Sequence, residues 1–62
     1  MENKIKVYRK EKGLTIGELA QLSDLSKGYL CHLENGGRTN PTMKVCEKIA
    51  KALDKKVMEI FF

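Results

Sequence analysis

The chain has 62 residues, of which 42% are hydrophobic and 32% are charged, with five Gly and one Pro. This length fits one small domain, expected to span residues 1–62, and leaves too little volume for a substrate pocket. Twelve Lys and Arg against eight Asp and Glu give a net charge of +4, which favours a polyanionic partner. No apolar run approaches the roughly 18 residues that a membrane span requires, so no membrane association is expected.

The two cysteines, Cys31 and Cys46, do not form a CxxC pair, and no signal-peptide pattern begins the chain. Free thiols and a cytoplasmic location are therefore expected. A zinc site would have to combine Cys31, His32 and Cys46, but adjacent residues point to different sides of a helix and no fourth ligand is evident. The single His and the lack of a Ser–His–Asp or paired-carboxylate arrangement argue against an enzyme. No metal, cofactor or small-molecule ligand is expected.

The first predicted helix runs from Glu2 to Glu11, with Ile5, Tyr8 and Arg9 facing inward. Gly13 follows as the glycine that ends this helix. Basic residues gather in this segment and again in the last third of the chain: Lys4, Lys6, Arg9, Lys10 and Lys12, then Lys44, Lys48, Lys51, Lys55 and Lys56. Each group fits either a solvated helix face or a polyanion-binding face.

The second predicted helix runs from Thr15 to about Ser23 and buries Leu19 and Ala20. Thr15 and Glu18 stand three residues apart, as in a capping box, where each side chain accepts a hydrogen bond from the backbone N–H of the other residue. This pairing indicates a well-defined helix start directly after the first helix.

A third helix follows after a very short connection. Only Ser23, Asp24 and Leu25 lie between the two helices, so the chain must turn sharply, and Asp24 is expected to adopt a left-handed backbone. Ser26 is placed to cap the third helix, which runs to about Asn35. A short helix, a tight turn and a second short helix make the unit that places its second helix in the major groove of DNA.

The third helix has an apolar face and a polar face. Leu30 and Leu33 are expected inside together with Leu25, whereas four residues point away from the core: Lys27, Gly28, Cys31 and His32. Gly28 weakens the helix by about 1 kcal/mol relative to Ala, which fits either fraying near the cap or close approach of the backbone to a partner. His32 fits either an exposed helix residue or a contact with DNA.

Gly36–Gly37 end the third helix, and a loop leads to Pro41 and to Thr42, the expected cap of a fourth helix. This helix runs to about Leu53 and carries one apolar stripe: Met43, Cys46, Ile49, Ala50 and Leu53. A short fifth helix is expected from Val57 to Phe61. No segment alternates β-branched or aromatic residues with polar ones over a usable length, so the predicted fold class is all-α.

The ordered pieces of this sequence resemble the Cro/Xre-like family of helix-turn-helix DNA-binding domains, which includes the phage repressors. The similarity extends from about Ile5 to Phe61 in the correct order and spacing. Its most specific pieces are Arg9-x-x-x-Gly13, Glu18-Leu19-Ala20, Ser26, Tyr29-Leu30, Leu33-Glu34-Asn35-Gly36, Asn40-Pro41 and Ile49-Ala50-Lys51-Ala52-Leu53.

The resemblance implies a compact, lambda-repressor-like bundle of four to five short helices, with the helix-turn-helix in the second and third. It pairs Arg9 with Glu34 as a buried structural ion pair, in which either charge alone would be costly. It assigns base reading to the outward residues of the third helix: Lys27, Gly28, Cys31 and His32. It assigns phosphate contacts to Thr15, Ile16, Gly17, Tyr29, Asn35, Arg38 and Thr39, and free N–H groups at the start of the second helix add to them.

Three residues depart from the pattern that the resemblance implies. Ile16 occupies the first position of the second helix, where the family often has a Gln that binds phosphate or braces a reading residue. Asp24 replaces the usual turn glycine. Lys56 stands where a Ser or Asp often caps the last helix, so that helix is expected to be less well anchored or to be completed by a partner subunit.

The resemblance implies sequence-specific binding of double-stranded DNA by a repressor-like transcriptional regulator that inserts its third helix into the major groove. One small reading helix specifies few base pairs, so a homodimer is expected. The tail Ile60-Phe61-Phe62 and the last helix either form the dimer contact or, in the case of Phe61, pack in the chain's own core. The alternative function is a helix-turn-helix protein-interaction module or antitoxin-like partner subunit with weak or lost DNA binding, which Ile16 and Gly28 favour.

Overall fold

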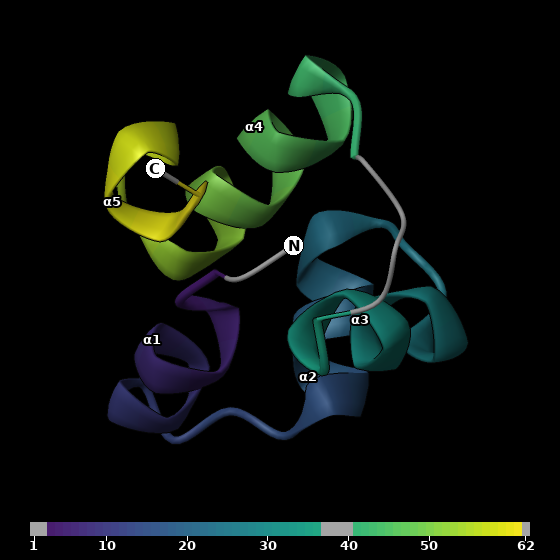
Figure 1. Cartoon of the computed structure of the whole chain (residues 1–62). Coiled ribbons are helices and arrows are strands. Elements are labelled where there is room, and N and C mark those ends of the chain that lie inside the picture. Colours follow the sequence, from purple (N-terminus) through teal and green to yellow (C-terminus); the bar gives the residue numbers. More distant parts are fainter. Residues whose placement is uncertain (1–2, 37–40, 62) are drawn as a thin grey trace.

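The computed structural model describes residues 3–36 and 41–61 of the chain. These residues form five helices and no strand: α1 (Ile5–Glu11), α2 (Ile16–Ser23), α3 (Lys27–Glu34), α4 (Met43–Leu53) and α5 (Val57–Phe61). The all-α fold class expected from the sequence is confirmed (Figure 1). Within the described ranges, none of these helices has the length and apolar character needed to cross a membrane.

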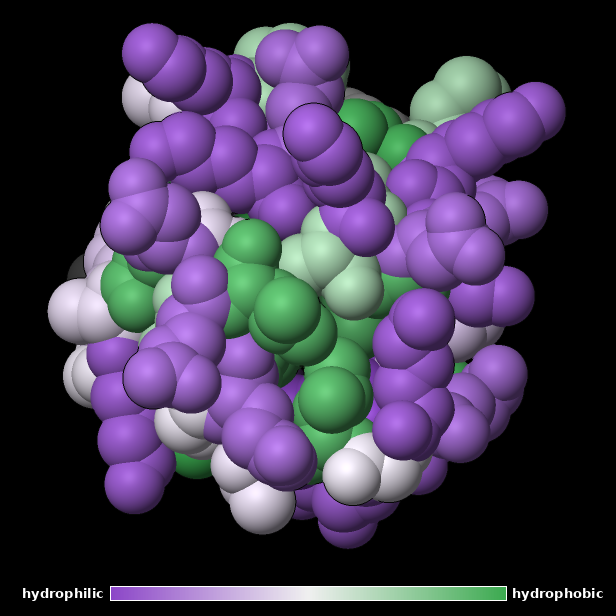
Figure 2. All heavy atoms as spheres, turned by 180° about the vertical axis from the view of Figure 1, so that it is seen from behind, coloured by the Kyte–Doolittle hydropathy of each residue, from purple (hydrophilic) through white to green (hydrophobic). Residues whose placement is uncertain are grey.

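α2 and α4 form the centre of the bundle, because α2 packs against α3 and α4 while α4 also contacts α1 and α5. Figure 1 shows α2 and α3 together on one side of the molecule, with α1, α4 and α5 on the other. The helices meet in one core, whose largest fully buried apolar side chains are Ile5, Leu19, Leu30, Leu33, Ile49, Leu53 and Ile60. Each such side chain stabilises the fold by about 1.5–3 kcal/mol. Figure 2 shows the opposite face, where apolar side chains reach the surface in a small area framed by hydrophilic ones.

The first helix begins later than the sequence predicts. α1 starts at Ile5 and not at Glu2, which lies outside the described residues. The side-chain oxygen of Asn3 accepts a hydrogen bond from the Ile5 N–H at 3.1 Å, and its amide donates to the Leu33 carbonyl at 2.8 Å. Asn is a common residue at helix starts for this reason. Asn3 therefore lies outside the helix, with its side chain between the first turn of α1 and the last turn of α3.

α2 and α3 begin at the caps that the sequence indicates. Thr15 Oγ1 accepts from the Glu18 N–H at 3.1 Å, and the Glu18 carboxylate accepts from the Thr15 N–H at 2.8 Å, which completes the capping box. Ser26 Oγ accepts from the Tyr29 N–H at 3.1 Å. Between the two helices Asp24 has a φ of 57° and a ψ of 41°, the expected left-handed conformation. The chain therefore turns within a few residues, as a helix-turn-helix requires.

α4 ends in a turn with the same backbone geometry as the turn after α2. Asp54 has a φ of 57° and a ψ of 44°, and the residue after it donates its N–H to the Ala50 carbonyl at 2.9 Å. In the earlier turn the residue after Asp24 donates to the Ala20 carbonyl at 3.0 Å. An aspartate in the left-handed conformation therefore ends both of the central helices.

The predicted apolar stripe of α4 is wrong at its first residue. The other four residues of the stripe are buried, but the Met43 side chain is 59% exposed. Thr42 Oγ1 caps the helix by accepting from the Val45 N–H at 3.2 Å. Met43 lies in this first turn, beyond the edge of the core, and Val45 packs against the core there instead.

The last two described residues pack inward. Ile60 and Phe61 are buried in the core, which corrects the expectation that these two residues form a dimer contact. Phe62 itself lies outside the described residues. The alternative considered for Phe61, packing in the chain's own core, is the one observed.

α5 is anchored within the chain at both of its ends. The Glu59 carboxylate accepts from the Lys56 N–H at 3.0 Å, which is the half of a capping box that does not need a Ser or Asp at the cap position. The Ile60 carbonyl accepts from the Lys4 N–H at 2.8 Å, which holds the last helix against the start of the chain. Neither contact requires a partner subunit.

Candidate nucleic-acid interface

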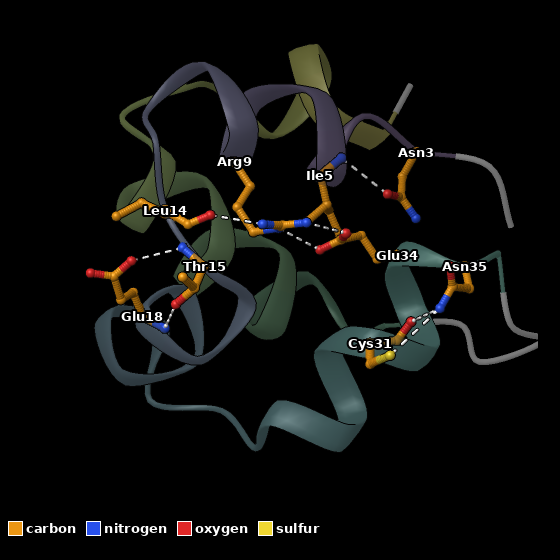
Figure 3. Close-up of polar contacts among 9 residues, drawn as sticks. All are labelled: Asn3, Ile5, Arg9, Leu14, Thr15, Glu18, Cys31, Glu34 and Asn35. Atoms are coloured by element: carbon orange, nitrogen blue, oxygen red, sulfur yellow. Dashed lines mark hydrogen bonds and ion pairs between the residues drawn. The ribbon is translucent and has the colours of Figure 1, made fainter.

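α3 is fixed in the bundle by an ion pair with α1. Arg9 Nε and Nη2 donate to the two carboxylate oxygens of Glu34, each at 2.9 Å, and Arg9 Nη1 donates to the Leu14 carbonyl at 2.7 Å. The two charged side chains are only 13% and 6% exposed. Figure 3 shows the guanidinium between Leu14 and Glu34. This one side chain therefore ties α1 to the segment before α2 and to the end of α3.

The environment of Arg9 favours its charged form. Hydrogen bonding to Glu34 raises the pKa of Arg9 above its ordinary value, although desolvation by burial acts in the opposite direction. Paired hydrogen bonds between a guanidinium and a carboxylate are strong and also directional. The pair therefore sets the orientation of the end of α3 as well as its position.

The four candidate base-reading residues lie on the exposed face of α3. Leu30 and Leu33 are buried on the inner face. The opposite face presents four exposed residues, here called the outer strip: Lys27, Gly28, Cys31 and His32. Residues three and four apart are neighbours on a helix surface, so the strip is continuous. It combines a cation, a position without a side chain, a thiol and an imidazole.

The start of α2 offers two backbone donors. The capping box uses the N–H groups of Thr15 and Glu18, whereas those of Ile16 and Gly17 have no hydrogen-bond partner among the described residues. Free N–H groups at a helix start attract anions. The Ile16 side chain packs against the core, so Ile16 can bind a phosphate only through its backbone.

Other candidate phosphate contacts are partly engaged within the fold. Tyr29 is half-buried and packs against the core. The Asn35 amide donates to the Cys31 carbonyl at 2.9 Å and lies 3.5 Å from the Cys31 sulfur. The two remaining candidates, Arg38 and Thr39, lie outside the described residues.

Two polar residues that support the site were missed by the sequence reasoning. Asn3 binds the Leu33 carbonyl and so contacts the last turn of α3; an Asn shortly before an apolar helical pattern is a start signal that could have indicated it. Ser23 is buried and donates its hydroxyl to the Leu19 carbonyl at 2.7 Å. No pattern in the sequence distinguishes this serine from an exposed one.

The two thiols lie in different environments. Cys31 is exposed and Cys46 is buried, and both are free. In residues 3–36 and 41–61, no three His, Cys, Asp or Glu side chains gather as the ligands of a metal ion would.

Comparison with known proteins decides the family. Residues 5–60, which are nearly the whole chain, match the helix-turn-helix family. The chain belongs to this family. The resemblance to Cro/Xre-like domains is thereby confirmed, and α2 and α3 are its helix-turn-helix.

The similar proteins are regulators and not enzymes. The HTH-type transcriptional regulator SinR of Bacillus subtilis is 43% identical over 54 residues, which cover 87% of this chain and 49% of SinR. SlrR of the same organism is 40% identical over 57 residues, which cover 92% of this chain and 38% of SlrR. The chain thus spans half or less of the length of these relatives. A crystal structure of SinR, the master regulator for biofilm formation, in complex with DNA has a TM-score of 0.84 and 42% identity, covering 89% of this chain and 87% of that chain.

Proposed function

We propose that the chain binds double-stranded DNA in a sequence-specific way, as a repressor-like transcriptional regulator that inserts α3 into the major groove. The outer strip of α3 carries this proposal, because its residues are all exposed on a helix whose other face is buried. The Arg9–Glu34 pair holds the end of the same helix. Reading of the major groove requires such a helix, rigidly held and with a free polar face.

The proposed contacts divide into base and phosphate contacts. Lys27 supplies a donor for guanine O6 and N7, and His32 can donate or accept at a base edge. The start of α2 binds a phosphate through the Thr15 hydroxyl and the free N–H groups of Ile16 and Gly17. The remaining phosphate contacts are proposed at Tyr29, Asn35, Arg38 and Thr39. Phosphate contacts would set the register, and base contacts would carry the sequence preference.

The relation to SinR supports DNA as the ligand, since that protein is solved in complex with DNA and is 42% identical. The net charge of +4 also fits a polyanionic ligand. A regulator acts in the compartment that holds the DNA, and we place this one in the cytoplasm.

A salt titration tests the proposal. The full chain is mixed with a fluorescent duplex, and the dissociation constant is measured by anisotropy at several salt concentrations. Release of counterions predicts a log–log slope of about −0.9 for each phosphate contacted, so binding at about 50 mM salt should weaken steeply by about 200 mM. A chain that fails to bind any duplex even at low salt would contradict the proposal.

A second candidate function is a protein-interaction module, or an antitoxin-like partner subunit with weak or lost DNA binding. Ile16 and Gly28 favour it, because one is apolar and the other lacks a side chain at positions proposed to face DNA. A hollow of about 410 Å³ between α2 and α4 also favours it; its lining is Leu22, Ser23, Asp24, Lys48, Lys51 and Ala52. The exposed Leu22 beside two lysines would suit an acidic partner. Under this function, the salt titration would show no binding to the duplex even at low salt.

The functional form is proposed to be a homodimer. One outer strip contacts only a few base pairs, and two copies related by a two-fold axis would read two half-sites about 34 Å apart. Since Ile60 and Phe61 are buried, the dimer contact has to use other residues. Met58 on α5, which is 72% exposed, is one large hydrophobic side chain that remains available.

A further inference from the structure

The hollow between α2 and α4 is apolar where it is most buried. The Ser23 hydroxyl lines it but is already engaged, since it donates to the Leu19 carbonyl at 2.7 Å. The Ala52 methyl group, which also lines the hollow, packs against the core. Leu22 stands beside these two residues with its side chain 61% exposed. The side chains of this part therefore offer apolar contact and no free hydrogen-bonding group.

Lysines line the α4 side of the hollow. Lys48 and Lys51 belong to a row at helical spacing: Lys44, Lys48, Lys51 and Lys55. In the described parts of the chain, no lysine of this row forms an ion pair, not even with Asp24, which lines the same hollow. Lys55 has a partner of another kind, because its ammonium group lies 4.9 Å from the centre of the Tyr8 ring. Like charges at this spacing destabilise a helix, so the row is a positive surface without an internal counter-charge.

We propose that the hollow between α2 and α4 binds an acidic, amphipathic helix of a second protein. In this kind of recognition a helix lays its apolar face into a groove. An apolar side chain of the partner would cover Leu22, and carboxylates beside it would face Lys48 and Lys51. These two lysines stand three residues apart, which is also a spacing of neighbouring side chains on the partner helix.

The lining of the hollow favours this occupant over a small ligand or DNA. Sites for small ligands combine an enclosed pocket with precisely placed polar groups, whereas the cations here are at the ends of flexible lysine side chains. A DNA phosphate backbone would match the lysines but would leave the apolar surface of Leu22 uncovered. An acidic helix with an apolar face matches both parts of the lining.

The hollow shares no residue with the proposed DNA contacts. Its lining comes from the end of α2, the turn after it and the second half of α4, whereas the DNA contacts are proposed at the start of α2, on the outer strip of α3 and just after it. The inference therefore goes beyond the second candidate function, in which DNA binding is weak or lost. The same chain would hold DNA and an acidic partner at the same time.

The test uses a library of random peptides displayed on phage, from which the immobilised full chain selects binders in the absence of DNA. We expect the enriched peptides to share apolar residues at spacings of three and four, flanked by Asp or Glu. One enriched peptide is then synthesised with a fluorescent label, and its dissociation constant is measured by anisotropy. Binding should weaken as salt is added, because salt screens the exposed lysines.

The apolar part of the hollow is tested with Leu22→Ala and its control Val7→Ala. Both substitutions shorten an apolar side chain that is more than half exposed, at 61% for Leu22 and 55% for Val7, and Val7 does not line the hollow. Both variants should fold, since surface substitutions change stability little. Leu22→Ala should bind the peptide about tenfold more weakly, as loss of a covered apolar side chain predicts. Val7→Ala should bind it like the parent chain.

The basic part is tested with Lys51→Glu and its control Lys6→Glu. Each substitution reverses one exposed charge, so the net charge of the two variants is the same. Lys51→Glu should weaken peptide binding about tenfold, because it places like charges opposite each other. Lys6→Glu, on α1, should have a much smaller effect. Lys51→Glu should keep the sequence preference of the chain for duplex DNA.

Several results would overturn the proposal. These are a library that yields no peptide, enriched peptides without acidic residues, and equal peptide affinity for the parent chain and either Leu22→Ala or Lys51→Glu. Dissociation of a dimer by Leu22→Ala in sedimentation would make the hollow a contact between two copies, and loss of DNA affinity in Lys51→Glu at every sequence would make the lysine row a phosphate contact. Because the peptide is measured without DNA, a failure of DNA binding contradicts the proposed function and leaves this inference standing.

Discussion

Among single residues, Arg9 and Glu34 have the largest effect on where α3 lies. All three guanidinium nitrogens of Arg9 are engaged, two on Glu34 and one on the Leu14 carbonyl. The substitution Glu34→Ala would leave this cation largely buried without its counter-charge, at a cost of about 3–5 kcal/mol. The melting temperature measured by circular dichroism should therefore fall by roughly 12–40 °C.

The control for this substitution is Glu47→Ala, which removes an exposed carboxylate from α4. Surface substitutions of this kind change stability by about 0.5 kcal/mol or less, so the melting curve should stay close to that of the parent chain. Coincident curves for Glu34→Ala and the parent chain would show that the ion pair does not stabilise the fold.

Lys27 is the residue of the outer strip for which base reading and phosphate binding can be distinguished most clearly. If Lys27 donates to a guanine, Lys27→Ala should relax the preference at one or two base positions by about 1–3 kcal/mol. This is measured as the affinities for a panel of single-base variants of a duplex that the chain enriches from random DNA. Lys51→Ala removes the same charge from the last turn of α4 and should leave every preference in place. A uniform loss across the panel in Lys27→Ala would make Lys27 a phosphate contact.

At the scale of helices, the left-handed aspartates set the ends of α2 and α4. Asp54 is the better one to test, because it lies outside the proposed interface. Its φ of 57° is strained for a residue with a Cβ, and a carboxylate at a helix C-terminus opposes the dipole. Asp54→Gly should raise the free energy of unfolding by about 0.5 kcal/mol, whereas Asp54→Ala should lower it, since Ala tolerates this conformation less well. Urea unfolding measures both, and the reverse order would contradict the account of the turn.

Helix boundaries that depend on nearby side chains could be predicted from the sequence. α2 and α3 lie within one residue of their expected bounds because Thr15, Glu18 and Ser26 carry the caps locally. The outer strip could also be predicted, since the helical period places its residues opposite Leu30 and Leu33. These parts needed no knowledge of the tertiary structure.

Some features that were mispredicted or left open depend on contacts between distant segments. The later start of α1 accompanies the contact of Asn3 with Leu33. The burial of Phe61, one of two alternatives left open by the sequence, follows from the packing of α5 on the core. Along the outer strip, the contact of Asn35 with Cys31 depends on a rotamer that no sequence pattern specifies. Sequence therefore indicated which residues face outward, but not which of them are already engaged.

At the scale of the whole molecule, its size limits how much of the proposed DNA site one copy can contact. The principal extents are 24 × 23 × 18 Å, which are smaller than the spacing of about 34 Å between half-sites one helical turn apart. One copy can therefore place its outer strip in one major-groove segment only. A palindromic site would need two copies bound to the same face of the duplex.

Selection of binding sites from random duplex DNA by the full chain tests the central claim most directly. Sequence-specific binding through α3 predicts one enriched motif made of two inverted half-sites, with centres separated by about one helical turn of 10–10.5 base pairs. A pool that stays random after repeated rounds at low salt would contradict the claim that the outer strip reads DNA.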